Sequence, residues 1–151
     1  MKLRPATLSD EKALFALHEE VFREHIERIW GWDDEWQITN FQKEWGMVIT
    51  EVIEDGEEVS GYLQIRQELE HLYVLNIALS CQHQNQGFGT QVIEILKKRA
   101  EAQGLPIKLN VFRTNERVIK FYERAGYKIY ETTETGCKMG WSNEAIEEDG
   151  A

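Results

Sequence analysis

Cysteine and proline are scarce in this chain, which has two of each in 151 residues. Two cysteines, Cys81 and Cys137, are too few for a disulfide framework, and no apolar export signal opens the sequence. We therefore expect two reduced thiols in a cytoplasmic protein. No low-complexity stretch or repeat marks a linker between domains. Because no run approaches the roughly 20 apolar residues of a membrane span, we expect no membrane partner.

Basic residues are also few, since 17 Lys and Arg stand against 27 Asp and Glu and give a formal net charge of −10. Binding to nucleic acid depends on neutralising phosphates with Lys and Arg, so we expect no nucleic-acid partner. The longest basic cluster, Lys97 to Arg99, is typical of the solvated face of a helix. Cys81 and His83 have the spacing of a ligand pair, but no second Cys/His pair lies nearby. We therefore predict no metal site.

The residues that are present suit one folded domain. The length falls in the usual range of a domain, and hydrophobic residues at 42% with charged residues at 29% are typical of globular proteins. We predict a single domain over residues 1–141. Residues 142–151 carry four acidic groups and one large apolar side chain, which predicts a flexible tail.

The spacing of apolar and turn-forming residues predicts an α/β (α+β) fold in which about seven strands form a mixed sheet with about four helices. The helices are expected from the cap Thr7 to Ile29, over Asp33–Trp45 and Gly89–Gln103, and from the cap Asn115 to Gly126. The strands are expected at Lys2–Ala6, Met47–Ile53, Glu58–Leu69, His71–Leu79, Ile107–Phe112, Tyr127–Thr133 and Cys137–Trp141.

A segment with two glycines lies between the apolar strand that ends at Leu79 and the third predicted helix. Gly87 and Gly89 allow the backbone to turn tightly and to approach a ligand, and the unpaired N–H groups at a helix start favour an anion. A Walker loop is excluded because Gly89 precedes Thr90 rather than Lys. A dinucleotide fingerprint is excluded because Val92 stands where a third Gly is needed. The alternative is that both glycines only shape the turn.

A later segment, Asn115 to Tyr127, favours the ligand-binding interpretation of the glycine segment over that of a simple turn. Together, the two segments resemble the GCN5-related N-acetyltransferase (GNAT) superfamily. In that family a Q/R-x-x-G-x-G/A loop binds a pyrophosphate, and an Asn-led helix carries a tyrosine. The matching residues here are Gln84, Gly87 and Gly89 in the loop, and Asn115 and Tyr122 in the helix. The specific match covers roughly Leu72 to Tyr130, and the order of elements extends the likeness over residues 1–141.

The resemblance implies a sheet splayed between its fourth and fifth strands, with acetyl-CoA as the acetyl donor. The pantetheine amides are expected to pair with the strand end as an added strand would, and the same N–H groups to polarise the thioester. The hydroxyl of Tyr122 is expected to protonate the departing thiolate, although its spacing alone favours a core aromatic. The expected cofactor-binding residues are Ile77, Ala78, Leu79, Gln84, Asn85, Gln86, Gly87, Phe88, Gly89, Thr90, Asn115 and Tyr122.

The acceptor is expected to be a small-molecule or peptide amine, which must lose a proton before it attacks. Some relatives carry a glutamate base on the central strand, where this sequence has Tyr73. That departure leaves Glu70, acting through water, as the candidate base, with His25 and Glu20 as more distant alternatives.

The family places its acceptor site beside the link between the first two helices, which here is rich in tryptophan. Three tryptophans could simply be core, but their flanking glycine and acids favour a slot with apolar walls and a negative mouth. The candidate acceptor-binding residues are His25, Trp30, Trp32, Trp36 and Tyr73.

We therefore predict an acetyl-CoA-dependent N-acetyltransferase in which a neutral amine attacks the thioester directly in a ternary complex. An acyl-enzyme on Cys81 is disfavoured, because no histidine beyond His83 is assignable as its partner. Two alternatives remain open. One is a non-catalytic acyl-CoA-binding or sensor domain on the same fold, and the other is an enzyme that uses a longer acyl group or acylates oxygen. The oligomeric state is open, and a homodimer is among the expected possibilities.

Overall fold

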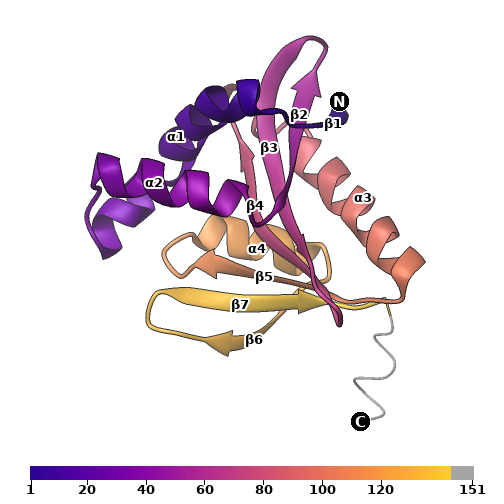
Figure 1. Cartoon of the computed structure of the whole chain (residues 1–151). Coiled ribbons are helices and arrows are strands. Elements are labelled where there is room, and N and C mark those ends of the chain that lie inside the picture. Colours follow the sequence, from indigo (N-terminus) through magenta and orange to yellow (C-terminus); the bar gives the residue numbers. More distant parts are fainter. Residues whose placement is uncertain (144–151) are drawn as a thin grey trace. The chain divides into compact units, whose positions relative to one another are not determined.

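The computed structural model describes residues 1–143 (Figure 1), and the predicted tail lies outside these residues from position 144 onward. In the described part, seven strands form one sheet in the order β1-β2-β3-β4-β5-β7-β6. The strands are β1 (Lys2–Pro5), β2 (Ile49–Asp55), β3 (Glu58–Gln67), β4 (Leu72–Leu79), β5 (Ile107–Phe112), β6 (Lys128–Thr132) and β7 (Gly136–Trp141). The helices are α1 (Glu11–Ile29), α2 (Asp34–Trp45), α3 (Phe88–Gln103) and α4 (Glu116–Arg124), with 3₁₀ turns η1 (Leu8–Asp10) and η2 (Cys81–His83).

This architecture confirms the predicted mixed α/β sheet with its seven strands and four helices. The pairs β1-β2, β2-β3, β5-β7 and β6-β7 are antiparallel. Strands β4 and β5 are neighbours in the sheet and are joined through α3, the kind of connection that parallel strands require. At their starts, the N–H of Leu72 donates to the carbonyl of Pro106 at 3.0 Å.

Some boundaries differ from the prediction. The sequence predicts one helix from the cap Thr7, but Thr7 and Asp10 form their capping box on η1, and α1 begins one residue later at Glu11. The prediction also misses η2, which follows β4 directly. Asp33 caps α2 as its position suggests, because its carboxylate accepts the N–H of Trp36.

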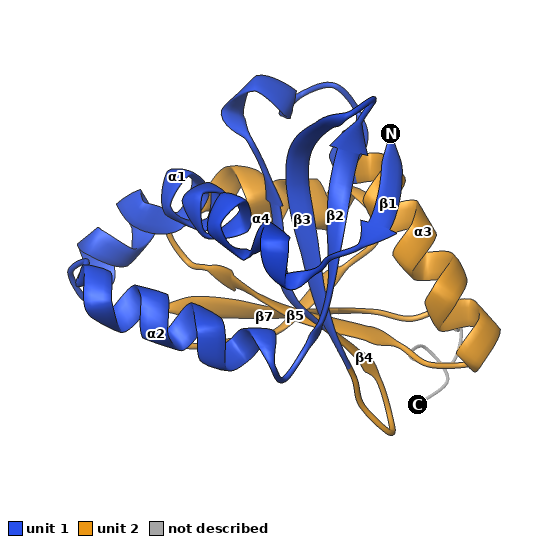
Figure 2. Cartoon of the chain, turned by 45° about the horizontal axis from the view of Figure 1, so that its top comes forward, with its two compact units in different colours: residues 1–66, 74–89 blue, residues 67–73, 90–151 orange. Residues whose placement is uncertain are grey.

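The chain divides into two compact units, shown in separate colours in Figure 2. Unit 1 comprises residues 1–66 and 74–89, and within the described part unit 2 comprises residues 67–73 and 90–143. Unit 1 contains β1, β2, most of β3 and β4, α1 and α2. Burial of large apolar side chains, worth about 1.5–3 kcal/mol each, ties its helices to its strands. This core comprises Leu14, Leu17, Phe41, Val52, Tyr62 and Ala78.

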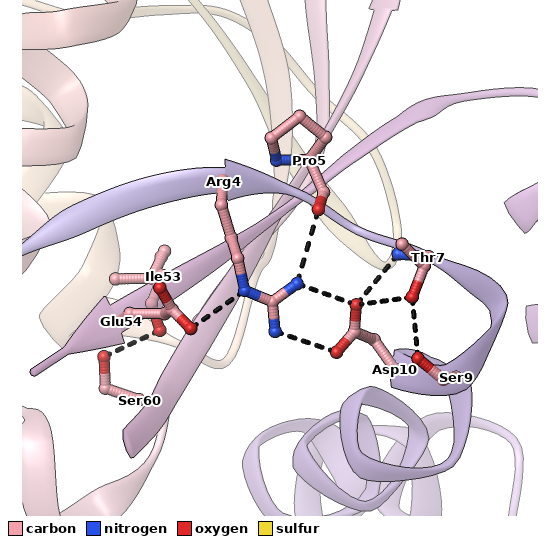
Figure 3. Close-up of polar contacts among 8 residues, drawn as sticks. All are labelled: Arg4, Pro5, Thr7, Ser9, Asp10, Ile53, Glu54 and Ser60. Atoms are coloured by element: carbon pink, nitrogen blue, oxygen red, sulfur yellow. Dashed lines mark hydrogen bonds and ion pairs between the residues drawn. The ribbon is translucent and has the colours of Figure 1, made fainter. Parts of the chain in front are cut away.

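A polar network fastens the 3₁₀ turn η1 to the edge strand β1 and its neighbour β2 (Figure 3). The guanidinium of Arg4 donates to both carboxylate oxygens of Asp10 at 2.9 Å and to Glu54 at 2.8 Å. Asp10 also accepts the N–H of Thr7 at 2.8 Å. Its hydrogen bonds with Arg4, and then with Thr7, lower the pKa of the Asp10 carboxyl to about 2. The network therefore joins η1 to both β1 and β2.

Unit 2 contains the antiparallel set β5-β7-β6, α4 and most of α3. The ammonium of Lys97 on α3 donates to the carbonyl of Ala125, directly after α4, and lies 5.4 Å from the ring of Trp141 on β7. This contact fixes the end of the helix that carries Tyr122. Strand β7 approaches β5 closely at Gly136, where a Cβ would lie 2.5 Å from Oδ1 of Asn110.

Candidate functional site

The backbone between η2 and α3 has the shape of an anion-binding loop. Asn85 and Gly87 adopt left-handed conformations, with φ of +65° and +85°. Such residues alternating with ordinary ones turn successive N–H groups toward one side, and α3 starts immediately afterwards at Phe88. A Cβ on Gly87 would meet no protein atom within 4 Å, so open space adjoins the backbone. These residues fit a phosphate group bound by backbone N–H donors.

Side chains at the start of this segment hold its backbone in place. The amide of Gln84 donates to the carbonyl of Leu79 at 3.0 Å, and that of Gln86 donates to Gln82 at 2.8 Å. The N–H of Cys81 donates to the carboxylate of Glu20 on α1 at 2.7 Å. The Gln84 amide thus shapes the loop, and its bond to Leu79 brings the loop and the end of β4 together. We call residues 84–89 the donor loop.

Strand β4, which is expected to pair with the pantetheine amides, lies very close to β3 at Gly61. The sequence analysis did not single out this glycine. Ala78 is buried in β4, and a Cβ on Gly61 of β3 would lie 2.2 Å from its carbonyl oxygen. No side chain fits at that distance, so Gly61 permits the close approach of β3 to β4. A glycine inside a strand is the sequence signal that could have revealed it.

Tyr122 and Asn115 lie on α4 in unit 2. Tyr122 is 6% exposed, its ring centroid is 5.2 Å from that of Tyr127, and burial raises the pKa of its hydroxyl. The hydroxyl forms no hydrogen bond with any described residue. Asn115 occupies the N-cap position of α4, but its side chain forms no capping hydrogen bond. This corrects the expectation that the side chain caps the helix, and leaves its amide for another partner.

The candidate base is at the surface. Glu70 is exposed in the bend that precedes β4, and Tyr73, the second residue of that strand, is half-buried. The Tyr73 ring lies 6.3 Å from that of His71, edge to face. Tyr73 stands at the strand position where some relatives are expected to carry a glutamate.

The tryptophans of the α1–α2 link do not behave alike. Trp30 and Trp36 are 64% and 60% exposed, which contradicts a core role for these two. Trp32 is half-buried, donates its Nε1–H to Asp34 at 2.7 Å and lies 5.3 Å beneath the guanidinium of Arg23. The link therefore exposes the rings of Trp30 and Trp36, whereas Arg23 covers one face of Trp32.

A histidine that the sequence analysis missed lies beneath Trp32. The ring of His18 is 5.8 Å from that of Trp32, and its Nε2 lies 3.0 Å from Oε1 of Gln37. Burial lowers the pKa of His18, so its ring is neutral at pH 7. His25, the histidine predicted for this region, is half-buried on α1. The signal that could have identified His18 is its helical spacing from Phe15 and Phe22, whose rings both contact its own.

Among residues 1–143, no group of three or more His, Cys, Asp or Glu is arranged to hold a metal ion. Within the same residues, no helix has the length and apolar character needed to cross a membrane.

Comparison with known proteins places the chain in a family. The model of the Acetyltransferase (GNAT) family matches residues 12–127. The chain belongs to the GNAT family. The match runs from α1 through Tyr127 and includes the donor loop and both Asn115 and Tyr122, so this GNAT protein is an acetyltransferase by family. No curated protein matches the sequence.

Solved structures show the same fold. One is the PaiA N-acetyltransferase from Thermoplasma acidophilum in complex with coenzyme A, at 14% identity and a TM-score of 0.77, covering 93% of this chain and 98% of that one. An acetyltransferase from Thermus thermophilus has 18% identity and a TM-score of 0.74, covering 93% and 96%. The ribosomal-protein-S18-alanine N-acetyltransferase from Escherichia coli has 17% identity and a TM-score of 0.71, covering 93% and 92%. At these identities the likeness shows the fold alone.

Proposed function

We propose that this GNAT protein transfers an acetyl group from acetyl-CoA to a primary amine by direct attack in a ternary complex. The observation that carries the proposal is the donor loop, in which Asn85 and Gly87 are left-handed directly before the start of α3. Such a loop binds a pyrophosphate through backbone N–H groups without any Lys or Arg. One of the similar structures was solved in complex with coenzyme A.

The donor is proposed to lie along the backbone of Ile77, Ala78 and Leu79, with its pyrophosphate on the donor loop and Thr90. Backbone N–H groups of the strand would stabilise negative charge on the thioester oxygen. Asn115 is proposed to contact the donor through the side-chain amide that does not cap α4.

Tyr122 is proposed as the general acid for the departing thiolate. Because burial raises the pKa of its hydroxyl, Tyr122 stays protonated at neutral pH and above. The same shift makes complete proton transfer to a thiolate unfavourable. The hydroxyl therefore acts first as a hydrogen-bond donor to the sulfur while the thioester C–S bond breaks. The CoA thiolate then takes up a proton as it equilibrates with solvent.

The acceptor amine must first become neutral. An alkylammonium with a pKa near 10.4 gives up its proton at pH 7 at a cost of roughly 4.6 kcal/mol. We propose that Glu70 accepts this proton through water, since it is exposed and lies before β4. Glu70→Gln should lower kcat/KM for the amine by less than about 100-fold, because a relay through water has other routes. A loss beyond about 10⁴-fold with abolition of the low-pH limb would identify Glu70 as the direct base instead.

The acceptor site is proposed on the α1–α2 link. Exposed Trp30 and Trp36 offer aromatic surface, Trp32 supports the link from its place between Arg23 and His18, and acidic neighbours favour a cation. His25 and Tyr73 remain predicted contributors. The amine that binds this surface is proposed to belong either to a small molecule or to a peptide. The predicted cytoplasmic location and a homodimer likewise remain predictions.

A screen of amine classes with acetyl-CoA, read by thiol release, tests the proposal. Turnover with at least one amine class, and none without amine, is the expected result. Tight CoA binding with no turnover across small amines, amino acids, polyamines and peptide amines would favour the non-catalytic sensor domain.

A further inference from the structure

A buried histidine lies directly before the donor loop. His83 is 5% exposed, and its ring stacks on that of Phe88, with centroids 6.0 Å apart and planes 18° from parallel. Phe88 begins α3 and stands between the two loop glycines. The Nδ1 of His83 lies 2.6 Å from the hydroxyl of Ser80, which fixes the rotation of the imidazole.

The other ring nitrogen of His83 faces acidic groups. Its Nε2 lies 3.9 Å from a carboxylate oxygen of Asp55, at the end of β2, and 3.9 Å from one of Glu58, at the start of β3. From α1, the carboxylate of Glu20 contacts the N–H of Cys81 in the same 3₁₀ turn. Helix α3 contributes the uncharged ring of Phe88. Three carboxylates thus adjoin a turn that leads into an anion-binding loop.

No lysine or arginine occurs between Arg66 and Lys97 in the sequence. The donor loop must therefore bind an anion through its backbone N–H groups, whose placement depends on how Phe88 and the start of α3 are held.

We propose that His83 is a positioning residue for the acyl donor: its ring, oriented by Ser80, holds Phe88 at the start of α3 and so fixes the backbone N–H groups of the donor loop. This inference rests on the proposed binding of acetyl-CoA. The stack depends on a flat ring in the buried position.

Two variants test this role. His83→Phe keeps a flat ring against Phe88, whereas His83→Ala removes the ring. Val52→Ala is the matched control, because it opens a buried site in the core of unit 1 without touching the donor loop. If His83→Ala does not fold, His83→Leu replaces it, since leucine fills the volume without a flat ring.

Calorimetry of CoA binding to the full chain is the measurement. We expect His83→Phe and Val52→Ala to match the wild type, and His83→Ala to bind CoA about tenfold more weakly. In assays, KM for acetyl-CoA should rise in His83→Ala while kcat stays within about twofold.

The outcomes distinguish this inference from the proposed function. Wild-type affinity in His83→Ala, or a loss of equal size in Val52→Ala, overturns the stacking role. A loss of CoA affinity in His83→Phe as large as that in His83→Ala also overturns it, because His83→Phe keeps the flat ring. In each case the wild type still binds CoA. A wild-type protein with no affinity for CoA overturns the proposed function, and this inference with it.

Discussion

Tyr122 has a buried ring and a hydroxyl that forms no hydrogen bond with the described residues. Its ring packs against Phe121 and Tyr127, at centroid distances of 5.3 and 5.2 Å, so the position is also a core position. The two interpretations of this residue, as core aromatic and as acid, therefore do not exclude each other. Packing fixes where the hydroxyl lies, and the absence of a hydrogen bond with any described residue leaves it for a ligand.

Replacement by phenylalanine separates the two roles, since Tyr122→Phe keeps the ring and removes only the oxygen. We expect kcat to fall by about 10²–10⁴-fold, with KM for acetyl-CoA changed much less, because a general acid acts in the transition state. Steady-state assays under conditions where the chemical step limits turnover measure both constants. Thermal unfolding of the variant should stay near that of the wild type. A wild-type kcat would return Tyr122 to a packing role alone.

Asp10 makes stability depend on pH at the acidic end. Its folded pKa of about 2 lies below the ordinary value of 3.8, so the Arg4–Asp10 pair stabilises the fold above about pH 4 and is lost as the pH falls toward 2. We expect Asp10→Asn to lower the free energy of unfolding by about 1–2 kcal/mol at pH 7, after allowance for solvent screening. The deficit relative to wild type should shrink between pH 4 and 2. Urea unfolding at several pH values measures it.

Glu24→Gln is the matched control for that prediction. Glu24 pairs with Arg28 at 3.1 Å, but both side chains are largely exposed on α1. An exposed pair of this kind contributes about 0.3–0.5 kcal/mol. An equal effect of the two substitutions would contradict the special role of the Arg4 network.

At the scale of elements, substitutions of two glycines distinguish the effect of backbone strain from the loss of a ligand contact in the donor loop. Gly87 and Gly104 both have positive φ, +85° and +66°, and a Cβ on either would meet no atom within 4 Å. Alanine at either position should therefore lower stability by a similar amount, about 1 kcal/mol. We expect only Gly87→Ala to lose CoA affinity, because its methyl group enters the space beside the loop N–H groups. Calorimetry on the folded variants checks this, and equal CoA affinities would remove the loop from the binding site.

Elements with a single strong local signal could be predicted from the sequence. The turn at Gly56 between β2 and β3 and the glycine stop of α3 at Gly104 follow from residues that tolerate positive φ. The start of α1 could not, because Thr7 caps η1, and what fixes η1 is the pairing of Asp10 with Arg4. The Arg4 guanidinium is shared with Glu54, which lies 50 residues further along the chain, and such a pairing has no local pattern.

In the candidate site too, features with a local sequence signal could be predicted and features that depend on tertiary contacts could not. Its glycine loop and Asn-led helix lie in continuous segments, so a resemblance could find them. His83 lies beside Asp55 and Glu58, and Gly61 lies against Ala78. Such pairings arise only when separate strands and turns fold together. The exposure of Trp30 and Trp36 is likewise a property of packing that their spacing does not determine.

At the scale of the whole chain, direct transfer of the acetyl group makes a prediction about both cysteines. Cys81 is exposed, and its contact with Glu20 and, secondarily, burial raise the pKa of its thiol, which disfavours the nucleophilic thiolate. Cys137 is buried on β7. These are the only cysteines in the sequence, and neither environment suits an acyl carrier.

We therefore expect the double variant Cys81→Ser/Cys137→Ala to keep kcat within about twofold of wild type, since neither thiol takes part in the chemistry. Initial rates at varied amine and acetyl-CoA concentrations should give intersecting double-reciprocal lines, because both substrates bind before any product leaves. Parallel lines, together with an acetylated cysteine in the mass spectrum of protein treated with acetyl-CoA alone, would instead establish a covalent route. Cys81→Ser alone would then identify the carrier, because Cys137 is shielded from a substrate in solution.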